Sequence, residues 1–206
     1  MKLKIFGLFL ILFLSGFEAF SQLLPGETKS NSIKPRNKPD GLAGSFFGGL
    51  ALKGTNAYDY WGLEGGLTAG GMISDHFGLA GAFYSLLTQN IRLMPEKPYI
   101  LKLTYGGIEP QFLFKFGNVV FQSKVLLALG YAGYSENVNF EVFSDSQGDW
   151  IFITEPSFGI SYIIDDSYWF TLDAGWRVTG NVDFKTFKKE NLNGPNVSLT
   201  FKSFMF

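Results

Sequence analysis

Apolar side chains recur at every second position along most of the chain after residue 42. This is the period of β-strands with two unlike faces, whereas an amphipathic helix repeats its apolar positions every three to four residues. In one run Trp61, Leu63 and Leu67 share a face, and Glu64 and Thr68 share the opposite one. The pattern predicts eight strands, at 42–53, 60–73, 77–87, 99–116, 119–134, 150–164, 168–178 and 195–206.

The predicted connections alternate between short and long. The short ones are turns at 74–76, 117–118 and 165–167, and the longer ones are loops at 54–59, 88–98, 135–149 and 179–194. Antiparallel strands of bacterial outer-membrane barrels are joined in this way, with short turns on the periplasmic side and longer loops outside. The sequence therefore predicts an all-β fold, an eight-stranded antiparallel up-and-down transmembrane β-barrel with both termini on the turn side.

The three short turns can be tested against the faces, because residues that oppose each other in an antiparallel hairpin share a side of the sheet. Turns of two or three residues bring together side chains of the same face in every case. The predicted facing pairs are Phe114 and Phe121, Phe112 and Ser123, Ile164 and Tyr168, Tyr162 and Phe170, Ile160 and Leu172, Glu155 and Arg177, Ile73 and Phe77, and Leu67 and Phe83.

Two strands break the alternation. In 99–116 the apolar positions are odd up to Tyr105 and even from Phe112, which predicts a β-bulge at Gly106–Gly107 because glycine tolerates one. In the last strand Phe204 and Phe206 lie on the face opposite to Leu199.

Charge indicates which face meets lipid, since Lys or Arg facing the middle of a bilayer costs ~2–4 kcal/mol. The charged side chains of the strands are assigned to the interior, which in a barrel of eight strands is only wide enough for side chains to fill it. We therefore expect a packed ion-pair network, with a narrow polar channel or a proton path as the alternative. Its predicted members are Glu64, Lys102, Glu109, Lys115, Lys124, Glu155, Asp173, Arg177 and Lys202.

Composition separates a membrane barrel from a soluble one. A lipocalin-like barrel would have the same alternation with the faces inverted, but only 17% of the residues are charged, which is low for a soluble barrel of this size. Aromatic residues also form two predicted belts, as interfacial girdles do. Trp61, Tyr84, Tyr131, Trp150 and Trp176 are expected near the loops, and Phe77, Phe116, Tyr162 and Tyr168 near the turns.

The first residues are those of an export signal rather than of the fold. Lys2 and Lys4 precede an apolar run, and Ala19–Phe20–Ser21 provides a cleavage site, so residues 1–21 are predicted to be a signal peptide. A single membrane anchor is the alternative, but the run is shorter than the ~20 residues that a spanning helix needs. Residues 22–41, rich in Pro, Lys and Asn, are expected to be a flexible periplasmic linker, and 42–206 the barrel.

At the level of pattern the chain resembles the small outer-membrane β-barrel families, similar in architecture to OmpX, OmpW and the OmpA transmembrane domain. The features that carry the resemblance are Phe20–Ser21–Gln22, the stretch from Tyr105 to Phe116 with its tight turn, Glu155–Pro156, Asn193–Gly194–Pro195 and the terminal Phe206. The resemblance implies a location in the outer membrane of a Gram-negative bacterium, but no reaction. It also implies that Phe206 is part of the signal read by the outer-membrane assembly machinery.

Residues that carry chemistry are few. His76 is the one histidine and falls in a predicted turn, as does Asp165–Asp166, where a turn-forming role is favoured. Glu141, Asp145 and Asp149 lack the spacing of a calcium loop, and the chain has no Cys. No catalytic, cofactor-binding or metal-binding residue is therefore predicted.

These observations favour a non-enzymatic, porin-like barrel that contacts lipid and presents loops to an extracellular partner. The net charge of −1 gives no electrostatic drive toward nucleic acid. Two alternatives stay open. One is an outer-leaflet enzyme that modifies lipid, although His76 falls at the wrong end of the barrel, and the other is a narrow channel for small solutes.

Overall fold

The computed structural model describes residues 41–57, 59–88, 92–94, 97–135, 147–165, 167–180 and 192–205. The predicted signal peptide, nearly all of the predicted linker and Phe206 lie outside these residues. The strands within them are β1 Phe46–Ala57, β2 Tyr60–Met72, β3 Phe77–Leu86, β4 Arg92–Met94, β5 Lys97–Phe116, β6 Val119–Ser135, β7 Gln147–Ile163, β8 Tyr168–Gly180 and β9 Gly194–Met205. No helix within the described ranges has the length and hydropathy needed to cross a membrane.

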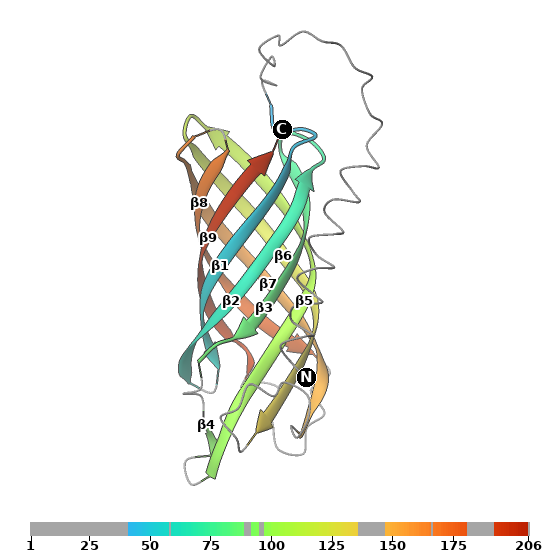
Figure 1. Ribbon diagram of the computed structural model, residues 1–206, viewed down its shortest axis with the longest axis vertical. Coiled ribbons are helices and arrows are strands. Elements are labelled where there is room, and N and C mark those ends of the chain that lie inside the picture. The colour runs from blue at the N-terminus through green and yellow to red at the C-terminus, as the bar shows by residue number, and fades with distance from the viewer. Residues whose placement is uncertain are drawn as a thin grey trace, which may run out of the picture. The chain divides into compact units, whose positions relative to one another are not determined.

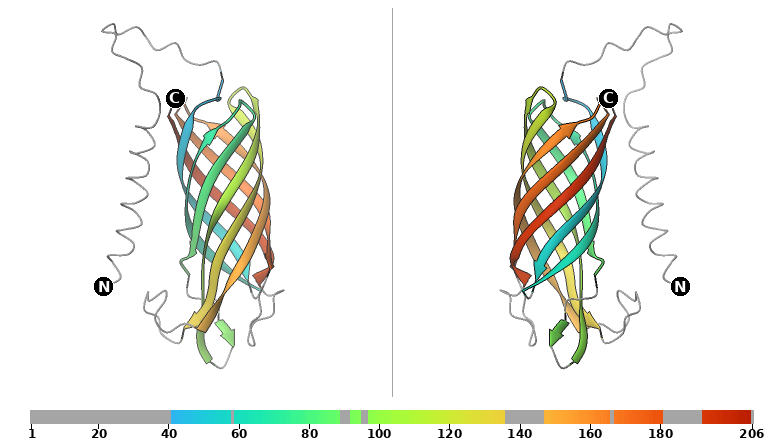
Figure 2. Two further views of the ribbon diagram at one scale, coloured as in Figure 1. Left: turned by 90° about the vertical axis from the view of Figure 1, so that its right-hand side faces the viewer. Right: turned by 90° about the vertical axis from the view of Figure 1, so that its left-hand side faces the viewer.

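Eight of these strands close into a barrel. Each pairs antiparallel with its neighbours in the chain, β1 also pairs with β9, and the β3–β5 pairing completes the ring (Figures 1 and 2). The short β4 adds to the start of β5 through Arg92↔Ile100 and Met94↔Lys97, so part of the predicted loop 88–98 is strand. In Figure 1 the start of β1 and the end of β9 lie at the same end of the barrel, as an even strand number requires. The predicted fold class is confirmed.

The registers predicted from the three short turns are confirmed. Phe114 pairs with Phe121, Leu67 with Phe83, and Ile160 with Leu172. At the tightest turn Gly117 has φ 60°, a left-handed conformation that glycine adopts without steric cost. The length of each turn, together with the rule that facing residues share a side of the sheet, was therefore sufficient to predict the register of these hairpins.

The predicted loop 54–59 is wrong. β1 continues to Ala57, which pairs with Tyr60, so the connection has only two residues. Lys53, Thr55 and Ala57 are buried on the inner face. Polar residues at the end of an alternating run suggested a loop, but the interior of this barrel accepts polar side chains, so the strand continues through them.

The predicted bulge at Gly106–Gly107 is also wrong. One register joins β5 to β6 from Ile100↔Ser135 to Phe116↔Val119 without a shift. Leu101, Leu103 and Tyr105 therefore point inward, and each is at most 2% exposed. The apparent change of phase arises because the interior is apolar near the loops.

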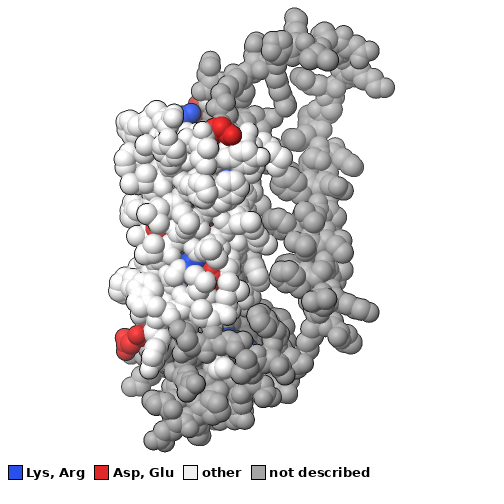
Figure 3. All heavy atoms as spheres, turned by 60° about the vertical axis from the view of Figure 1, so that its left-hand side comes forward, with Lys and Arg blue, Asp and Glu red and all other residues white. Residues whose placement is uncertain are grey.

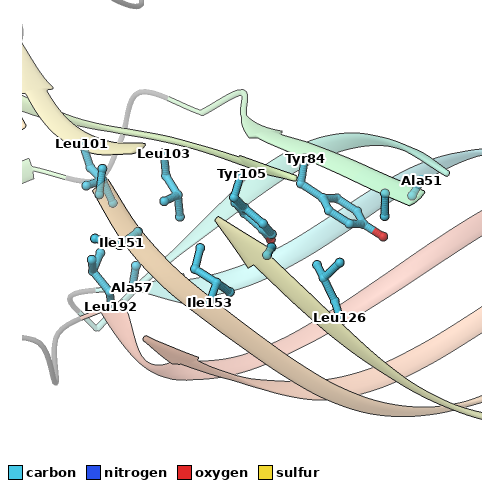
Figure 4. Packing of buried hydrophobic residues seen from close by; sticks show 13 residues of the cluster. Ala51, Ala57, Tyr84, Leu101, Leu103, Tyr105, Leu126, Ile151, Ile153 and Leu192 are labelled. Atoms are coloured by element: carbon cyan, nitrogen blue, oxygen red, sulfur yellow. The ribbon is translucent and has the colours of Figure 1, made fainter. Parts of the chain in front are cut away.

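Two apolar clusters lie inside the barrel, one toward each end. The loop-side cluster includes Leu101, Leu103, Ile151 and Ile153 of the strands and Leu192 from just before β9, which lie together in Figure 4. The turn-end cluster comprises Leu42, Phe47, Met72, Ala80, Leu113, Val120, Ile163, Trp169 and Phe204. The off-phase Phe204 is thereby explained, since it points inward and lies 4.2 Å from the Trp169 ring.

Candidate functional site

The middle of the barrel, between the two apolar clusters, is filled by charged side chains. Among the described residues eight charged side chains are buried there, four acidic and four basic, so their formal charges cancel. They are Lys53, Glu64, Glu109, Lys124, Glu155, Asp173, Arg177 and Lys202. Strand alternation places them there, because each occupies an inward position of its strand. Their contacts divide them into two clusters.

The loop-side charge cluster is built around Arg177. Its Nη2 lies 2.6 Å from Glu64 Oε1 and its Nε lies 2.6 Å from Glu155 Oε1, so one guanidinium bridges carboxylates from β2 and β7. Lys53 Nζ lies 2.5 Å from the other oxygen of Glu155. The Tyr105 hydroxyl sits between the two carboxylates, 2.6 Å from Glu64 Oε2 and 3.1 Å from Glu155 Oε1. Two cations thus balance two anions.

An aromatic ring supports Lys53 in this cluster. The Lys53 ammonium lies 3.4 Å from the centroid of the Tyr84 ring, a cation–π geometry that gains strength where water is excluded. The Tyr84 ring stacks in turn on Tyr105, with centroids 5.5 Å apart. The structure places Tyr84 in the lumen, so its predicted place in the loop-side aromatic belt is wrong.

The turn-side charge cluster is built around Asp173. Lys124 Nζ lies 3.0 Å from Asp173 Oδ2 and 3.7 Å from Glu109 Oε2. Asp173 also accepts hydrogen bonds from the Gln122 amide and from Ser198 Oγ, the latter at 3.2 Å. Both oxygens of the Asp173 carboxylate are therefore bound by side chains of β6 and β9.

Lys202 is held differently. Its ammonium donates to two amide oxygens, Gln111 Oε1 at 3.3 Å and Gln122 Oε1 at 3.1 Å, and lies 5.3 Å from the Phe47 ring. Gln122 donates to Asp173 at the same time. An amide with both a donor and an acceptor thus links the lysine to the carboxylate, at the boundary with the turn-end apolar cluster.

A small gap separates the two charge clusters. It is lined by residues of both, among them Lys53, Tyr84, Glu109 and Asn196, and has room for about one water molecule. Asn196 Nδ2 and Arg177 Nη1 are buried and have no hydrogen-bond partner among the described residues.

Two residues predicted for the interior lie elsewhere. Lys102 is on the outer face of β5, near the loop end. It precedes by two residues Thr104, which pairs with Tyr131. It follows from the continuous register that its neighbours Leu101 and Leu103 take the interior. Lys115 has an inward position but is exposed beside the turn at Gly117. The prediction that outward positions carry no charge is therefore wrong at Lys102.

Other members of the interior were missed by the sequence prediction. Lys53 was taken as the last residue of its strand, and Tyr105 was assigned to the outer face because it continued an apolar run. The signal that could have identified Lys53 is the inward alternation of Ala51, Lys53 and Thr55. Phe206, the predicted assembly signal, lies outside the described residues.

The outer face is apolar. Large hydrophobic side chains of every barrel strand are exposed there, including Leu50, Leu127, Phe158 and Leu172. The face in Figure 3 is almost entirely uncharged over the described residues. Aromatic residues occupy both margins of this band. Trp61, Trp150 and Trp176 are exposed toward the loops, and Phe116, Tyr162 and Tyr168 toward the turns.

The remaining candidates for chemistry have structural roles. His76 lies in the turn between β2 and β3, and its Nδ1 is 3.1 Å from the carbonyl oxygen of Leu113 on β5. Asp165 Oδ1 accepts from the backbone N–H groups of Ser167 and Tyr168 at 2.8 and 2.9 Å, as expected of an Asp in a turn. Across the described ranges no three His, Asp or Glu side chains are arranged to hold a metal ion. Glu141 and Asp145 lie outside those ranges.

Gly66 makes room for the loop-side charge cluster. A Cβ at this position would lie 2.3 Å from Tyr84 Cδ1 and 3.0 Å from the carbonyl oxygen of Phe83. We expect Gly66→Ala to lower the free energy of unfolding by about 1–3 kcal/mol through overpacking. Gly48→Ala is the control, since its Cβ would meet nothing within 4 Å. Urea titration of both variants in detergent measures the effect, and equal losses would contradict the assignment.

The sequence matches no protein-family model and no curated protein sequence. Solved structures share its fold. The crystal structure of Neisserial surface protein A matches with a TM-score of 0.54 at 13% identity, over 78% of this chain and 95% of that one. The N-terminal β-barrel domain of Pseudomonas aeruginosa OprF matches with a TM-score of 0.52 at 10% identity, over 79% and 98%. The chain therefore has the eight-stranded barrel fold of the small outer-membrane proteins that its sequence resembles.

Proposed function

We propose that the protein is an integral barrel of the outer membrane of a Gram-negative bacterium, with a non-enzymatic role. One observation carries the proposal, namely that the barrel is apolar outside and charged inside. A soluble barrel would expose Glu64, Asp173 and Arg177 and enclose Leu127 and Leu172, because charges need water and apolar surface avoids it. In lipid the outer surface must be apolar and the charged side chains must lie inside, so this distribution suits a bilayer.

The lumen supports an anchoring role rather than transport. Its charged groups pair with one another, except Lys202, which donates to two amide oxygens. The two apolar clusters lie between these groups and the ends of the barrel. An ion that entered would have to leave its hydration shell at an apolar constriction, which is costly. We therefore propose that the barrel holds its loops at the cell surface, where 135–149 and 179–194 contact an extracellular partner.

Orientation follows from the proposal. The termini and the short turns would face the periplasm, and the assembly machinery would read the terminal Phe206. Trypsin added to intact cells is expected to cleave after Lys185, Lys188 or Lys189 in the loop 179–194. An epitope tag placed in the segment 22–41 is expected to survive until the outer membrane is permeabilised. Tag loss from intact cells, with the loop spared, would contradict this orientation.

Membrane integration has a direct assay. After cells are broken and their membranes are washed in alkaline carbonate, the protein is expected to stay in the membrane pellet and to need detergent for release. Its recovery in the wash would overturn the proposal.

Conductance separates the anchoring role from the channel alternative. When the purified protein is inserted into a planar lipid bilayer, we expect no discrete conductance steps above those of the bilayer alone. Reproducible steps of one size, which persist after repurification, would instead favour a channel for small solutes. A protein of known porin activity, inserted in the same way, serves as the positive control.

A further inference from the structure

The short segment that precedes β1 folds back on the end of the barrel. Gly44 N donates to Met72 O at 2.8 Å and Met72 N donates to Ser45 O at 2.8 Å, so the segment is joined to the end of β2. Within it, Ser45 N and Ser45 Oγ both donate to Leu42 O, at 3.1 and 2.6 Å. Gly44 has φ 80°, the left-handed conformation that this tight turn needs. Figure 2 shows the segment in blue at the upper rim.

The turn delivers one apolar side chain to the interior. Leu42 is 6% exposed and belongs to the turn-end apolar cluster with Phe47, Met72 and Trp169. Among the described residues it is the one member of that cluster that comes from outside the strands. Leu42 therefore covers the cluster at the turn end of the lumen.

A single carboxylate holds the first residues of this segment. Asp75 Oδ1 accepts from the backbone N–H groups of Leu42 and Ala43, at 2.8 and 2.9 Å. The turn that carries Asp75 does not depend on this carboxylate, because Ser74 Oγ accepts from Phe77 N and His76 N within it, at 3.1 and 3.4 Å. The Asp75 contact thus serves the segment before β1.

Residue 41 fits the same arrangement. A Cβ on Gly41 would lie 2.2 Å from Asp75 Oδ1, the oxygen that accepts both hydrogen bonds. Only glycine lets the carboxylate approach the backbone this closely. The contact between the segment and the turn therefore depends on both Asp75 in the turn and Gly41 in the segment.

We propose that residues 41–45 form a lid over the turn end of the lumen and that the Asp75 carboxylate is its latch. The strands of the barrel are held by ladders of hydrogen bonds, whereas the lid is held by a few contacts that include an exposed carboxylate. Segments with few and exposed hydrogen bonds open at the lowest free energy. Release of the latch exposes the turn-end apolar cluster to water while the barrel stays closed.

Cysteine labelling tests the lid, because the chain has no Cys of its own. Ala80 is 3% exposed and belongs to the turn-end cluster, so A80C reports access from that end. In lipid nanodiscs, which leave both ends of the barrel open to water, Asp75→Ala is expected to raise the rate of A80C modification by a small methanethiosulfonate about tenfold. Leu42→Ala is expected to raise it similarly, with no further rise in the double variant.

Three matched controls make the result specific. Asp75→Asn retains an oxygen that accepts the two N–H groups, so its labelling rate is expected to stay near that of A80C alone. Ser74→Ala removes hydrogen bonds of the turn but leaves the latch, and is expected to have no effect. A132C in the loop-side cluster should label at the same slow rate with or without Asp75→Ala.

Other outcomes overturn the proposal. If A80C labels at the same rate in Asp75→Ala as in its parent, the carboxylate holds no lid. If Ser74→Ala or Asp75→Asn accelerates labelling as much as Asp75→Ala, the effect belongs to the turn or to its charge. If A132C accelerates in parallel, the whole barrel has loosened. Cold gel mobility of each variant, compared with its boiled form, verifies that the barrel has folded.

Discussion

Replacement of Arg177 by methionine is expected to lower the free energy of unfolding by about 3–5 kcal/mol, one of the two largest single losses that we expect in this protein. Arg177 is fully buried and bridges Glu64 and Glu155 at 2.6 Å each. Its removal leaves Glu64 as a buried carboxylate without a cation, while Glu155 keeps Lys53. Denaturant titration of the refolded protein in detergent or lipid vesicles measures the loss.

Two further variants identify the cause of that loss. Glu64→Gln in the Arg177→Met background removes the uncompensated charge and is expected to restore part of the stability. Lys115→Met removes an exposed lysine at the turn end and is expected to change stability by less than ~0.5 kcal/mol. If Arg177→Met cost no more than Lys115→Met, the interior ion pairs would contribute nothing to the fold.

The second large effect is expected on the outer face. Leu172 is 58% exposed in the middle of β8 and lies between the outward residues Ile160 and Leu199. Leu172→Arg is expected to destabilise the folded state in a bilayer by about 2–4 kcal/mol, because the guanidinium would face hydrocarbon. The reference state is the unfolded chain in water, so folding into vesicles under denaturant is the appropriate assay.

A second arginine on the same strand provides the comparison. Val178 lies on the same face, two residues beyond the loop-side Trp176, and is 46% exposed. Val178→Arg is expected to cost only ~0–1 kcal/mol, since the penalty falls toward the interface. Equal losses at 172 and 178, or a gain in stability at 172, would indicate that this face meets water.

The strands and most of their ends could be predicted from the sequence because period and turn length are local signals. Phe114↔Phe121 and Ile160↔Leu172 follow from turn length and shared faces alone. The wrong bulge and the wrong faces of Tyr105 and Lys102 share one physical cause, the assumption that the interior is polar along its full length. Leu101, Leu103 and Phe204 violate it near the ends, where apolar side chains fill the lumen. The wrong loop 54–59 has another cause, because polar residues that continue an inward alternation were assigned to a loop.

The candidate site was predictable only in part, for a related reason. Membership of Glu64, Glu155 and Arg177 in the interior follows from alternation, and the Glu155–Arg177 pair follows from the turn between β7 and β8. The other partners depend on how strands that are not neighbours in the sheet meet inside the ring. Lys53 and Glu155 lie on β1 and β7, which are not neighbours in the sheet. A pattern within one strand or hairpin cannot predict a contact between strands that are not paired. The signal peptide, the linker and the role of Phe206 stay predictions.

The sidedness of the wall is tested most directly by a spin-label scan along β8 in lipid nanodiscs, with one cysteine at a time from 168 to 178. Collision with dissolved oxygen reports contact with lipid, and collision with a water-soluble nickel chelate reports contact with water. We expect oxygen accessibility at Phe170, Leu172 and Ala174, and little access to either reagent at Thr171 and Asp173. Strong nickel accessibility at 170, 172 and 174, or oxygen accessibility at 171 and 173, would contradict a barrel that turns its apolar face to the membrane.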